Sequence, residues 1–250
     1  MAKKSAPRKR VRREIVDETS IERAMELNYK RPKITMRGLL NINAKHQEML
    51  RYIQDEKTNM VFVNGPAGTA KTYVGVYGAL ELLKTEKVDE IIYIRSIIES
   101  ASKSMGALPG ELDDKFQPYT MPLIDKLSEI LPSQEIQPLF EAQMIRTVPV
   151  NFTRGLTFNR ACVIIDEAQN LTKKELVTIL TRFGNKSTYI VCGDTFQNDI
   201  KDTGFGDIMT KFDTPKSKTH KIFCCNFDKT DIVRSAILKY IVSVLEDHSQ

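Results

Sequence analysis

One short segment combines the residue types that bind phosphate groups. An apolar run at residues 60–63 leads into Asn64-Gly65-Pro66-Ala67-Gly68-Thr69-Ala70-Lys71-Thr72 and then into a helix-length segment at 71–84. Glycines in such a loop let successive backbone N–H groups turn toward one anion, and the helix N-terminus adds positive potential. Lys71 would reach the β- and γ-phosphates of a nucleotide, and the Thr72 hydroxyl would bind Mg²⁺. The expected nucleotide-binding residues are Gly65, Pro66, Ala67, Gly68, Thr69, Ala70, Lys71 and Thr72.

Ala70 stands where phosphate-binding loops of this kind usually carry a glycine. A methyl group is tolerated at this point if the residue has the φ of a right-handed helix. The alternative interpretation of the whole segment is a surface turn that precedes a helix.

A second segment supplies two adjacent carboxylates. Asp166 and Glu167 follow the apolar run at 161–165, so they would lie at the carboxyl edge of a sheet, where open α/β folds bind ligands. Asp166 would hold the Mg²⁺ shell, and Glu167 would orient or deprotonate an attacking water. Alone, such a pair is often only a helix cap. Together with the glycine-bearing loop upstream, it predicts catalysis.

Two glutamines are weaker candidates. Gln197 follows a further apolar run at 189–192 and could sense the γ-phosphate or position the water. The less favoured alternative is a polar loop residue. Gln47 lies on a predicted helix at 46–56, where a glutamine that reads adenine is expected. Glutamines are also common on exposed helix faces.

Three arginines could stabilise transition-state charge, either in their own subunit or in a neighbouring one. Arg182 ends the helix-length segment at 172–183, and Arg234 lies near the start of the segment at 229–246. Arg154 precedes Gly155. Each could instead form a surface ion pair, which contributes little; Arg182 and Arg234 are favoured.

Regular alternation of strands and helices positions these candidates. Short, wholly apolar runs separated by helix-length segments are typical of a parallel sheet buried on both faces, so the sequence predicts a three-layer α/β domain. Thr172 with Glu175 fits a capping box, and Gly184 fits the end of the same helix. The predicted strands are residues 60–63, 91–94, 162–165, 189–192 and 222–225.

A long insertion separates the second and third of these strands. Residues 96–150 are rich in proline and too long for a simple crossover, and insertions of that size are often functional. A helix is predicted near 123–131, ended by Pro132. A weaker strand is expected at 146–150, confined to a sheet edge by Pro149.

Charge and composition limit the class of protein. The 250 residues contain 37 Lys and Arg against 32 Asp and Glu, but seven of the basic residues lie within residues 1–13. We interpret residues 1–19 as a disordered basic tail and residues 20–250 as a single domain. No apolar run approaches the roughly 18 residues of a membrane span, the basic start lacks the apolar segment of a signal peptide, and four cysteines without a CxxC pair make no disulfide framework. A cytoplasmic location is expected.

Taken together, the segments resemble the PhoH-like family, which is related to the core of superfamily 1 helicases. The resemblance rests on residues 65–72, Gly106 to Pro122, Arg154-Gly155, Asp166 to Asn170, Leu180 to Gly184, Gly193-Asp194 with Gln197, and Asp231 to Arg234. It covers roughly residues 45–245. Departures are Ala70, where the family has glycine, and Ser235, where it usually has histidine.

This resemblance implies ATP binding and hydrolysis by one RecA-like P-loop NTPase domain with Mg²⁺. It also implies a homo-oligomer, such as a hexameric ring, and an association with single-stranded nucleic acid, RNA being favoured over DNA. The cell would be bacterial or a virus-infected bacterial host. The alternative is a nucleotide-dependent switch or assembly protein with slow turnover. A small-molecule kinase is disfavoured because no arginine-rich lid is evident.

Overall fold

The computed structural model describes residues 31–39, 42–96, 112–197, 203–233 and 236–247. The chain divides into residues 1–32 and 33–250, and the architecture below is that of the second unit. The basic tail predicted at residues 1–19 and the domain boundary predicted at residue 20 lie outside the described residues.

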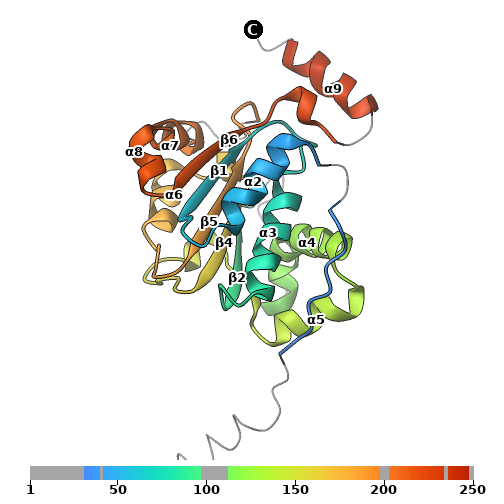
Figure 1. Ribbon diagram of the computed structural model, residues 1–250, viewed down its shortest axis with the longest axis vertical. Helices are drawn as coiled ribbons and strands as arrows, with labels where there is room; N and C mark the ends of the chain where they lie inside the picture. Colours follow the sequence, from blue (N-terminus) through green and yellow to red (C-terminus); the bar gives the residue numbers. More distant parts are fainter. Residues whose placement is uncertain (1–30, 40–41, 97–111, 198–202, 234–235, 248–250) are drawn as a thin grey trace, which may run out of the picture. The chain divides into compact units, whose positions relative to one another are not determined.

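A six-stranded sheet forms the middle layer, with strand order β3-β2-β4-β5-β1-β6 and every neighbouring pair parallel (Figure 1). Because all strands run the same way, their carboxyl ends meet at one edge. The strands are β1 (Met60–Asn64), β2 (Glu90–Arg95), β3 (Ile145–Thr147), β4 (Ala161–Asp166), β5 (Thr188–Gly193) and β6 (Ile222–Asn226).

Helices cover both faces of this sheet. Figure 1 shows α2, α3 and α4 on one side and α6, α7 and α8 on the other. The helices are α2 (Ala44–Gln54), α3 (Lys71–Lys84), α4 (Leu112–Ile130), α5 (Ser133–Glu141), α6 (Lys173–Leu180), α7 (Phe205–Phe212), α8 (Pro215–Thr219) and α9 (Ala236–Asp247), with short 3-10 turns η1 (Val150–Phe152), η2 (Ala168–Asn170) and η3 (Lys229–Asp231).

Side chains that alternate along each strand fill two separate cores. Val61 and Val63 of β1 belong to the core beneath α2 to α5, whereas Met60 and Phe62 belong to the core beneath α6 and α7. Successive strand residues point to opposite faces, so a strand covered on both faces is apolar throughout. The predicted three-layer α/β class with a mostly parallel sheet is therefore confirmed.

The predicted insertion between the second and third core strands is also found. It contains α4, α5 and the edge strand β3, which pairs with β2 alone. That strand begins one residue earlier than predicted and ends at Thr147. The helix predicted near 123–131 is longer, because α4 starts at Leu112 and includes Pro118 and Pro122.

Two helix predictions need correction. The capping box of Thr172 and Glu175 is present, but α6 ends at Leu180 with Thr181 as its C-cap. Gly184 therefore does not end the helix; it lies so close to the chain at Phe158 that a Cβ would be 2.3 Å from that carbonyl oxygen. The segment predicted as one helix at 229–246 is divided between η3 and α9.

Helix α2 packs closely on α3 at Gly78, where a Cβ would lie 2.7 Å from Cγ2 of the fully buried Ile53. Substituting Gly78→Ala should lower the free energy of unfolding by about 1–2 kcal/mol, because this overlap exceeds the gain in helix propensity. Chemical denaturation measures the change. Gly206→Ala in α7 is the matched control: its Cβ would meet nothing nearer than 3.4 Å, so it should stabilise by up to about 1 kcal/mol. Equal effects at the two positions would contradict this packing analysis.

Candidate nucleotide-binding site

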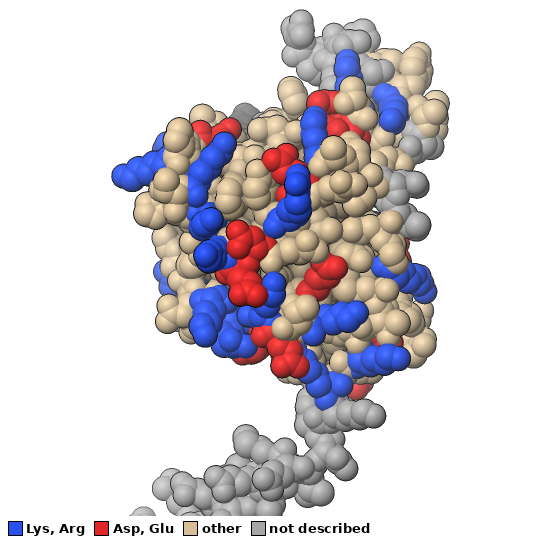
Figure 2. Space-filling model, in the orientation of Figure 1, with Lys and Arg blue, Asp and Glu red and all other residues tan. Residues whose placement is uncertain are grey.

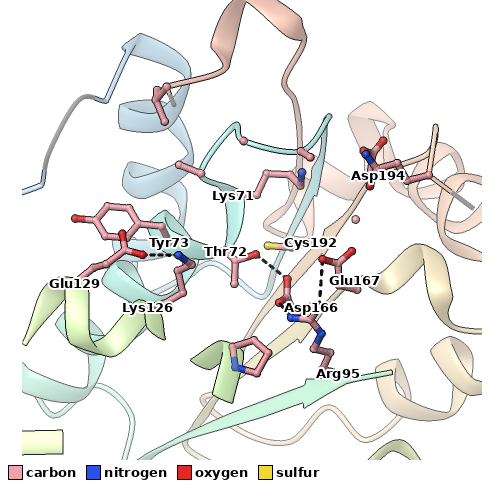
Figure 3. Close-up of a pocket in the computed structure, with 17 residues that line it drawn as sticks. Lys71, Thr72, Tyr73, Arg95, Lys126, Glu129, Asp166, Glu167, Cys192 and Asp194 are labelled. Carbon is pink, nitrogen blue, oxygen red and sulfur yellow. Dashed lines mark hydrogen bonds and ion pairs between the residues drawn. The ribbon is translucent and has the colours of Figure 1, made fainter. Parts of the chain in front are cut away.

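A cavity of about 640 Å³ lies at the carboxyl edge of the sheet (Figure 3). The ends of β2, β4 and β5 line it together with the loop between β1 and α3. Ligands of open α/β folds bind at this edge. Among the residues predicted from sequence, those that line it are Ala67, Gly68, Ala70, Lys71, Thr72, Asp166, Glu167 and Gln197.

The loop after β1 needs glycine at two positions. A Cβ on Gly65 would lie 2.6 Å from Cβ of Phe227, so only a glycine lets this part of the chain approach so closely. Gly68 has a φ of +84°, a left-handed conformation that glycine adopts at little cost. Both glycines thus shape the turn that brings the chain into α3.

Ala70 does not have the right-handed helical φ under which a methyl group would be tolerated at this position. Its φ of 54° and ψ of 22° are left-handed, not those of a right-handed helix. For a residue with a Cβ this conformation costs roughly 1–2 kcal/mol. Ala70 is therefore a strained point at the start of α3, which explains why glycine is usual at this position.

Lys71 turns its ammonium group into the loop. Its Nζ donates hydrogen bonds to the carbonyl oxygens of Gly65 and Pro66, the latter at 3.0 Å. The loop is further fixed by Thr69, whose hydroxyl donates to the Pro66 carbonyl at 2.8 Å. A positive charge and the start of a helix thus meet on one concave surface, as phosphate binding requires.

Asp166 joins the two segments that sequence analysis paired. Its Oδ1 accepts a hydrogen bond of 2.7 Å from the Thr72 hydroxyl, and its Oδ2 accepts one from Tyr93. Burial and the Asp166 carboxylate raise the pKa of Tyr93, so this phenol stays protonated and remains a donor. Asp166 is almost fully buried, and these two donors hold both of its oxygens.

Glu167 has two partners of its own. Its Oε1 is 3.6 Å from Nη2 of Arg95, and its Oε2 accepts a hydrogen bond of 2.6 Å from the side-chain amide of Gln169. The backbone of Glu167 is left-handed, with a φ of 52°. This local strain turns the chain sharply after β4, a feature often found at functional sites.

Asp194 is a lining residue that sequence analysis did not assign. Burial raises the pKa of its carboxyl group, and its Oδ2 has no hydrogen-bond partner among the described residues. Its backbone N–H donates to the Gln169 side chain at 3.0 Å, which connects the end of β5 to Glu167. In the sequence, the pair Gly193-Asp194 directly after a buried strand is the pattern that could have identified Asp194 as a site residue.

A separate group of contacts anchors the phosphate-binding loop from outside. Buried His46 of α2 contacts the Thr69 carbonyl through Nε2 at 2.8 Å, and the Val233 N–H donates to the Gly68 carbonyl at 3.2 Å. Asp231 links the start of α2 to the segment that contains Val233, since it accepts hydrogen bonds from Asn43 at 2.7 Å and from Lys45 at 2.6 Å.

Comparison with known proteins assigns the family. The sequence model of a family described as "PhoH-like protein" matches residues 40–246. A PhoH-like protein of Bacillus subtilis is 35% identical over 207 residues, covering 82% of this chain and 64% of that protein. Protein PhoH of Escherichia coli K12 is 34% identical over 202 residues, covering 78% and 56%. The chain belongs to the PhoH-like family. It spans less than two thirds of the length of these relatives.

Similarity to solved structures is lower. The Pif1 helicase of Candida albicans matches with a TM-score of 0.38 and 14% identity, over 76% of this chain and 40% of that one. PCH-2 of C. elegans matches with a TM-score of 0.34 and 15% identity, over 84% and 50%. Family membership and the loop geometry indicate a P-loop nucleotide-binding protein.

Several predicted residues of this PhoH-like chain lie away from the cavity. Gln47 is exposed on α2 and does not line it. Arg182 lies beyond the far end of α6, where its Nε donates to the Thr178 carbonyl at 3.3 Å. Arg154 is exposed. Arg234, like Ser235, lies outside the described residues. The roles proposed for Gln47, Arg182 and Arg234 stay predictions, and Arg182 would need a neighbouring subunit.

The insertion contributes a wall that the sequence did not reveal. Pro122, Lys126 and Glu129 of α4 line the cavity, and Lys126 forms an ion pair of 2.5 Å with Glu129. In the sequence, only the length of the insertion and its many prolines indicated that it could contribute to the site. Helical periodicity does not tell which face of α4 meets the site, because that depends on how the helix crosses the sheet.

Thr72 and Asp166 present oxygens of the kind that Mg²⁺ prefers. Their direct contact shows that a hydroxyl and a carboxylate meet beside the phosphate-binding loop. The described residues contain no group of three or more His, Cys, Asp or Glu that could hold a metal ion. Mg²⁺ is usually held by one or two carboxylates and the substrate phosphates, so the residues fit this ion.

No helix of the described residues is long and apolar enough to cross a membrane.

Asp231→Asn tests the anchoring contacts. Burial disfavours the Asp231 charge, but hydrogen bonds from Lys45, Asp228 and Asn43 outweigh it and lower the pKa from 3.8. We expect a loss of about 1–2 kcal/mol in the free energy of unfolding at neutral pH. Because the folded pKa is lowered, this contribution is full above pH 3.8 and is lost as the pH falls through the folded pKa.

Denaturation at a series of pH values measures the difference between the two proteins. Asp125→Asn, on the exposed side of α4, is the control and should change stability little at any pH. A difference between wild type and Asp231→Asn that does not shrink on acidification would contradict the assignment.

Proposed function

We propose that this PhoH-like chain is a Mg²⁺-dependent ATPase. The observation that carries the proposal is the contact between Thr72 and Asp166, with Glu167 beside them and Lys71 in the adjoining loop. This combination brings the ammonium group of Lys71, a hydroxyl that contacts a carboxylate, and a second carboxylate into one cavity, as binding of a nucleotide with Mg²⁺ would need. A protein that only bound nucleotide would not need the second carboxylate.

Each residue has a defined part in the proposed reaction. The backbone N–H groups of residues 65–72 and the Lys71 ammonium bind the β- and γ-phosphates, while Gln47 contacts adenine. Thr72 and Asp166 hold the Mg²⁺, which when bound neutralises charge on the phosphate oxygens. Gln197 also lines the cavity, and its proposed part is to sense the γ-phosphate.

Hydrolysis requires a water in line with the γ-phosphate. Glu167 orients this water and accepts its proton as the oxygen–phosphorus bond forms, and the bond between the γ-phosphorus and the bridging oxygen breaks. The products are ADP and phosphate. Arg182 or Arg234 of a neighbouring subunit would stabilise the charge that develops.

We further propose that single-stranded nucleic acid, RNA in preference to DNA, is the polymer on which the ATPase acts. Acidic and basic side chains are interspersed on the face shown in Figure 2, so among the described residues this face offers no continuous basic surface. The seven basic residues of positions 1–13 would then supply the phosphate contacts, with an affinity that falls as salt rises. Such an enzyme would act in the cytoplasm of a bacterial cell or of a virus-infected bacterial host.

An apolar stripe on α9 supports a homo-oligomer, such as a hexameric ring. Ile237, Tyr240, Ile241 and Val244 follow helical spacing, and the first two are 61% and 65% exposed. A stripe of this kind normally faces another protein surface. A second copy of the chain would cover it and bring a neighbouring arginine to the cavity.

A nucleotide-dependent switch with slow turnover is the second candidate. The strained left-handed Ala70 favours it, since the loop lacks the glycine that is usual just before the lysine of such loops. The two functions differ in whether Glu167 is needed after nucleotide has bound.

Steady-state hydrolysis separates these functions. Glu167→Gln should keep ATP affinity but lower the rate of hydrolysis by roughly 10²–10⁴-fold, because the group acting on the water is lost. Lys71→Ala should lower nucleotide affinity as well. ATP binding and phosphate release are measured for all three proteins, with and without single-stranded RNA or DNA, at two salt concentrations.

The control is Lys84→Ala, a surface lysine at the end of α3, which should hydrolyse ATP at the wild-type rate. Hydrolysis by Glu167→Gln at the wild-type rate would contradict the assignment of that residue. Binding without turnover in the wild type would favour the switch protein. A rate indifferent to both polymers would remove nucleic acid from the proposal.

The oligomer is tested separately. Introducing charge into the stripe with Ile237→Glu and Ile241→Glu should dissociate the assembly to monomers, because burying two carboxylates in an apolar interface is unfavourable. Light scattering measures the mass. Lys239→Gln, an exposed position on the same helix, should leave it unchanged. A mass that is equal in wild type and double variant would contradict a role for α9 in assembly.

A further inference from the structure

Gln169 is a buried amide with a polar contact at each end. It is 1% exposed and does not line the cavity. Its Nε2 donates a hydrogen bond of 2.6 Å to Oε2 of Glu167, and its Oε1 accepts one of 3.0 Å from the backbone N–H of Asp194. Burial of an amide is unfavourable unless its polar atoms are paired, so these two contacts are what make a glutamine tolerable at this position.

The two partners allow this amide only one orientation. The backbone N–H of Asp194 can only donate a hydrogen bond, and the carboxylate of Glu167 can only accept one. Turning the amide over would place two donors together at Asp194 and two acceptors together at Glu167. Gln169 therefore presents its donor to Glu167 from a fixed direction.

The backbone that holds the amide is itself fixed. Asp194 begins a turn after β5, and the next residue, Thr195, donates its N–H to the side chain of Asn64 at 3.0 Å. This bond ties the turn to the end of β1. Gln169 lies in η2, two residues after Glu167, so its side chain connects the turn after β5 to the residue that follows β4.

Glu167 has little other support. Its side chain is 37% exposed, and Nη2 of Arg95 is 3.6 Å from its Oε1, which is beyond hydrogen-bond distance. Within the part of the chain that the structure describes, the bond from Gln169 is the one side-chain hydrogen bond that its carboxylate receives. Each carboxylate oxygen has two acceptor sites, so this bond leaves both oxygens able to bind a water.

We propose that Gln169 is a positioning residue, whose amide holds the Glu167 carboxylate in one place while its remaining acceptor sites stay free for the attacking water. The inference rests on the proposed ATPase function and adds a residue that lies outside the cavity. The N–H of Gln197 donates to the Asp194 carbonyl at 3.3 Å. The residue proposed to sense the γ-phosphate and the carboxylate proposed to act on the water thus share one support.

Two substitutions separate the two ends of the amide. Gln169→Glu keeps an oxygen for the Asp194 N–H but replaces the donor to Glu167 with an acceptor, and Gln169→Met removes both contacts at similar volume. Both should lower kcat about 10- to 100-fold, because a small misplacement of a reacting group has an effect of this size. KM and ATP affinity should keep their wild-type values, because the phosphate-binding loop is untouched. Rates are expressed per molecule that binds nucleotide, so that unfolded protein does not count.

The Glu167→Gln background tests whether the effect passes through Glu167. Single-turnover phosphate release makes the slow rates of these proteins measurable. In this background the two substitutions should lower the remaining rate no further, because the group that they misplace is gone. An equal fold loss in both backgrounds, or a wild-type kcat in Gln169→Glu, would overturn the inference.

Gln54→Met is the matched control. The side-chain amide of Gln54 in α2 also donates to a glutamate, Glu81 of α3, and neither residue lines the cavity. Its loss should change stability and leave kcat as it is. A fall in kcat as large as that of Gln169→Met would contradict a specific role for the amide at 169.

A measurement without turnover keeps the failure of the two proposals apart. The free energies of unfolding of Gln169→Met, Glu167→Ala and the double variant form a cycle, and the contact predicts that the two single effects do not add. Additive effects would overturn the inference. If the wild type binds ATP without hydrolysing it, the ATPase proposal fails instead, and a non-additive cycle would still support the hold of Gln169 on Glu167.

Discussion

The hydrogen bond between Thr72 and Asp166 joins two segments that lie 94 residues apart in the sequence. It can form only because β1 and β4 run parallel and end at the same edge, with β5 between them. Each strand must be apolar on both faces to be buried there, and polar residues can appear only where the strand ends. The same constraint brings Arg95 opposite Asp166 and Asp194 beside Gln169. The chemistry of the cavity is thus a consequence of strand register.

Much of this arrangement could be predicted from sequence, for a specific reason. Five strands were recognised because unbroken apolar runs such as 162–165 are characteristic of buried parallel strands, and Lys71 and Asp166 because their residue types recur with fixed spacing from those strands. Arg95 and Gln169 were missed. Their importance lies in contacts made across neighbouring strands and turns, and a single sequence does not specify which side chains meet there. The left-handed φ of Ala70 could not be predicted either, because the fold of the whole loop sets it.

The loop between β1 and α3 is held by tertiary contacts on both flanks, not by its own sequence alone. His46 reaches one carbonyl and Val233 another, and Asp231 ties the two flanks together through Asn43 and Lys45. These contacts restrain the backbone of the loop and offset the strain at Ala70. Preorganisation of this kind lowers the entropic cost of binding an anion. Asp231 is one of the residues on which the resemblance to the PhoH-like family rests. In the structure it holds the two flanks of the loop together through its hydrogen bonds to Asn43 and Lys45.

Leu238 of α9 rests directly on the phosphate-binding loop. A Cβ added to Gly68 would lie 2.6 Å from Cδ2 of Leu238, so the loop and this helix each limit where the other can lie. The same helix carries the exposed apolar stripe. A partner that shifts α9 when it covers the stripe would therefore also change the affinity of the loop for phosphate. Because such coupling is reciprocal, bound nucleotide would change the affinity of the chain for that partner by the same factor. In an oligomer built through this stripe, the terminal helix would couple assembly to nucleotide binding.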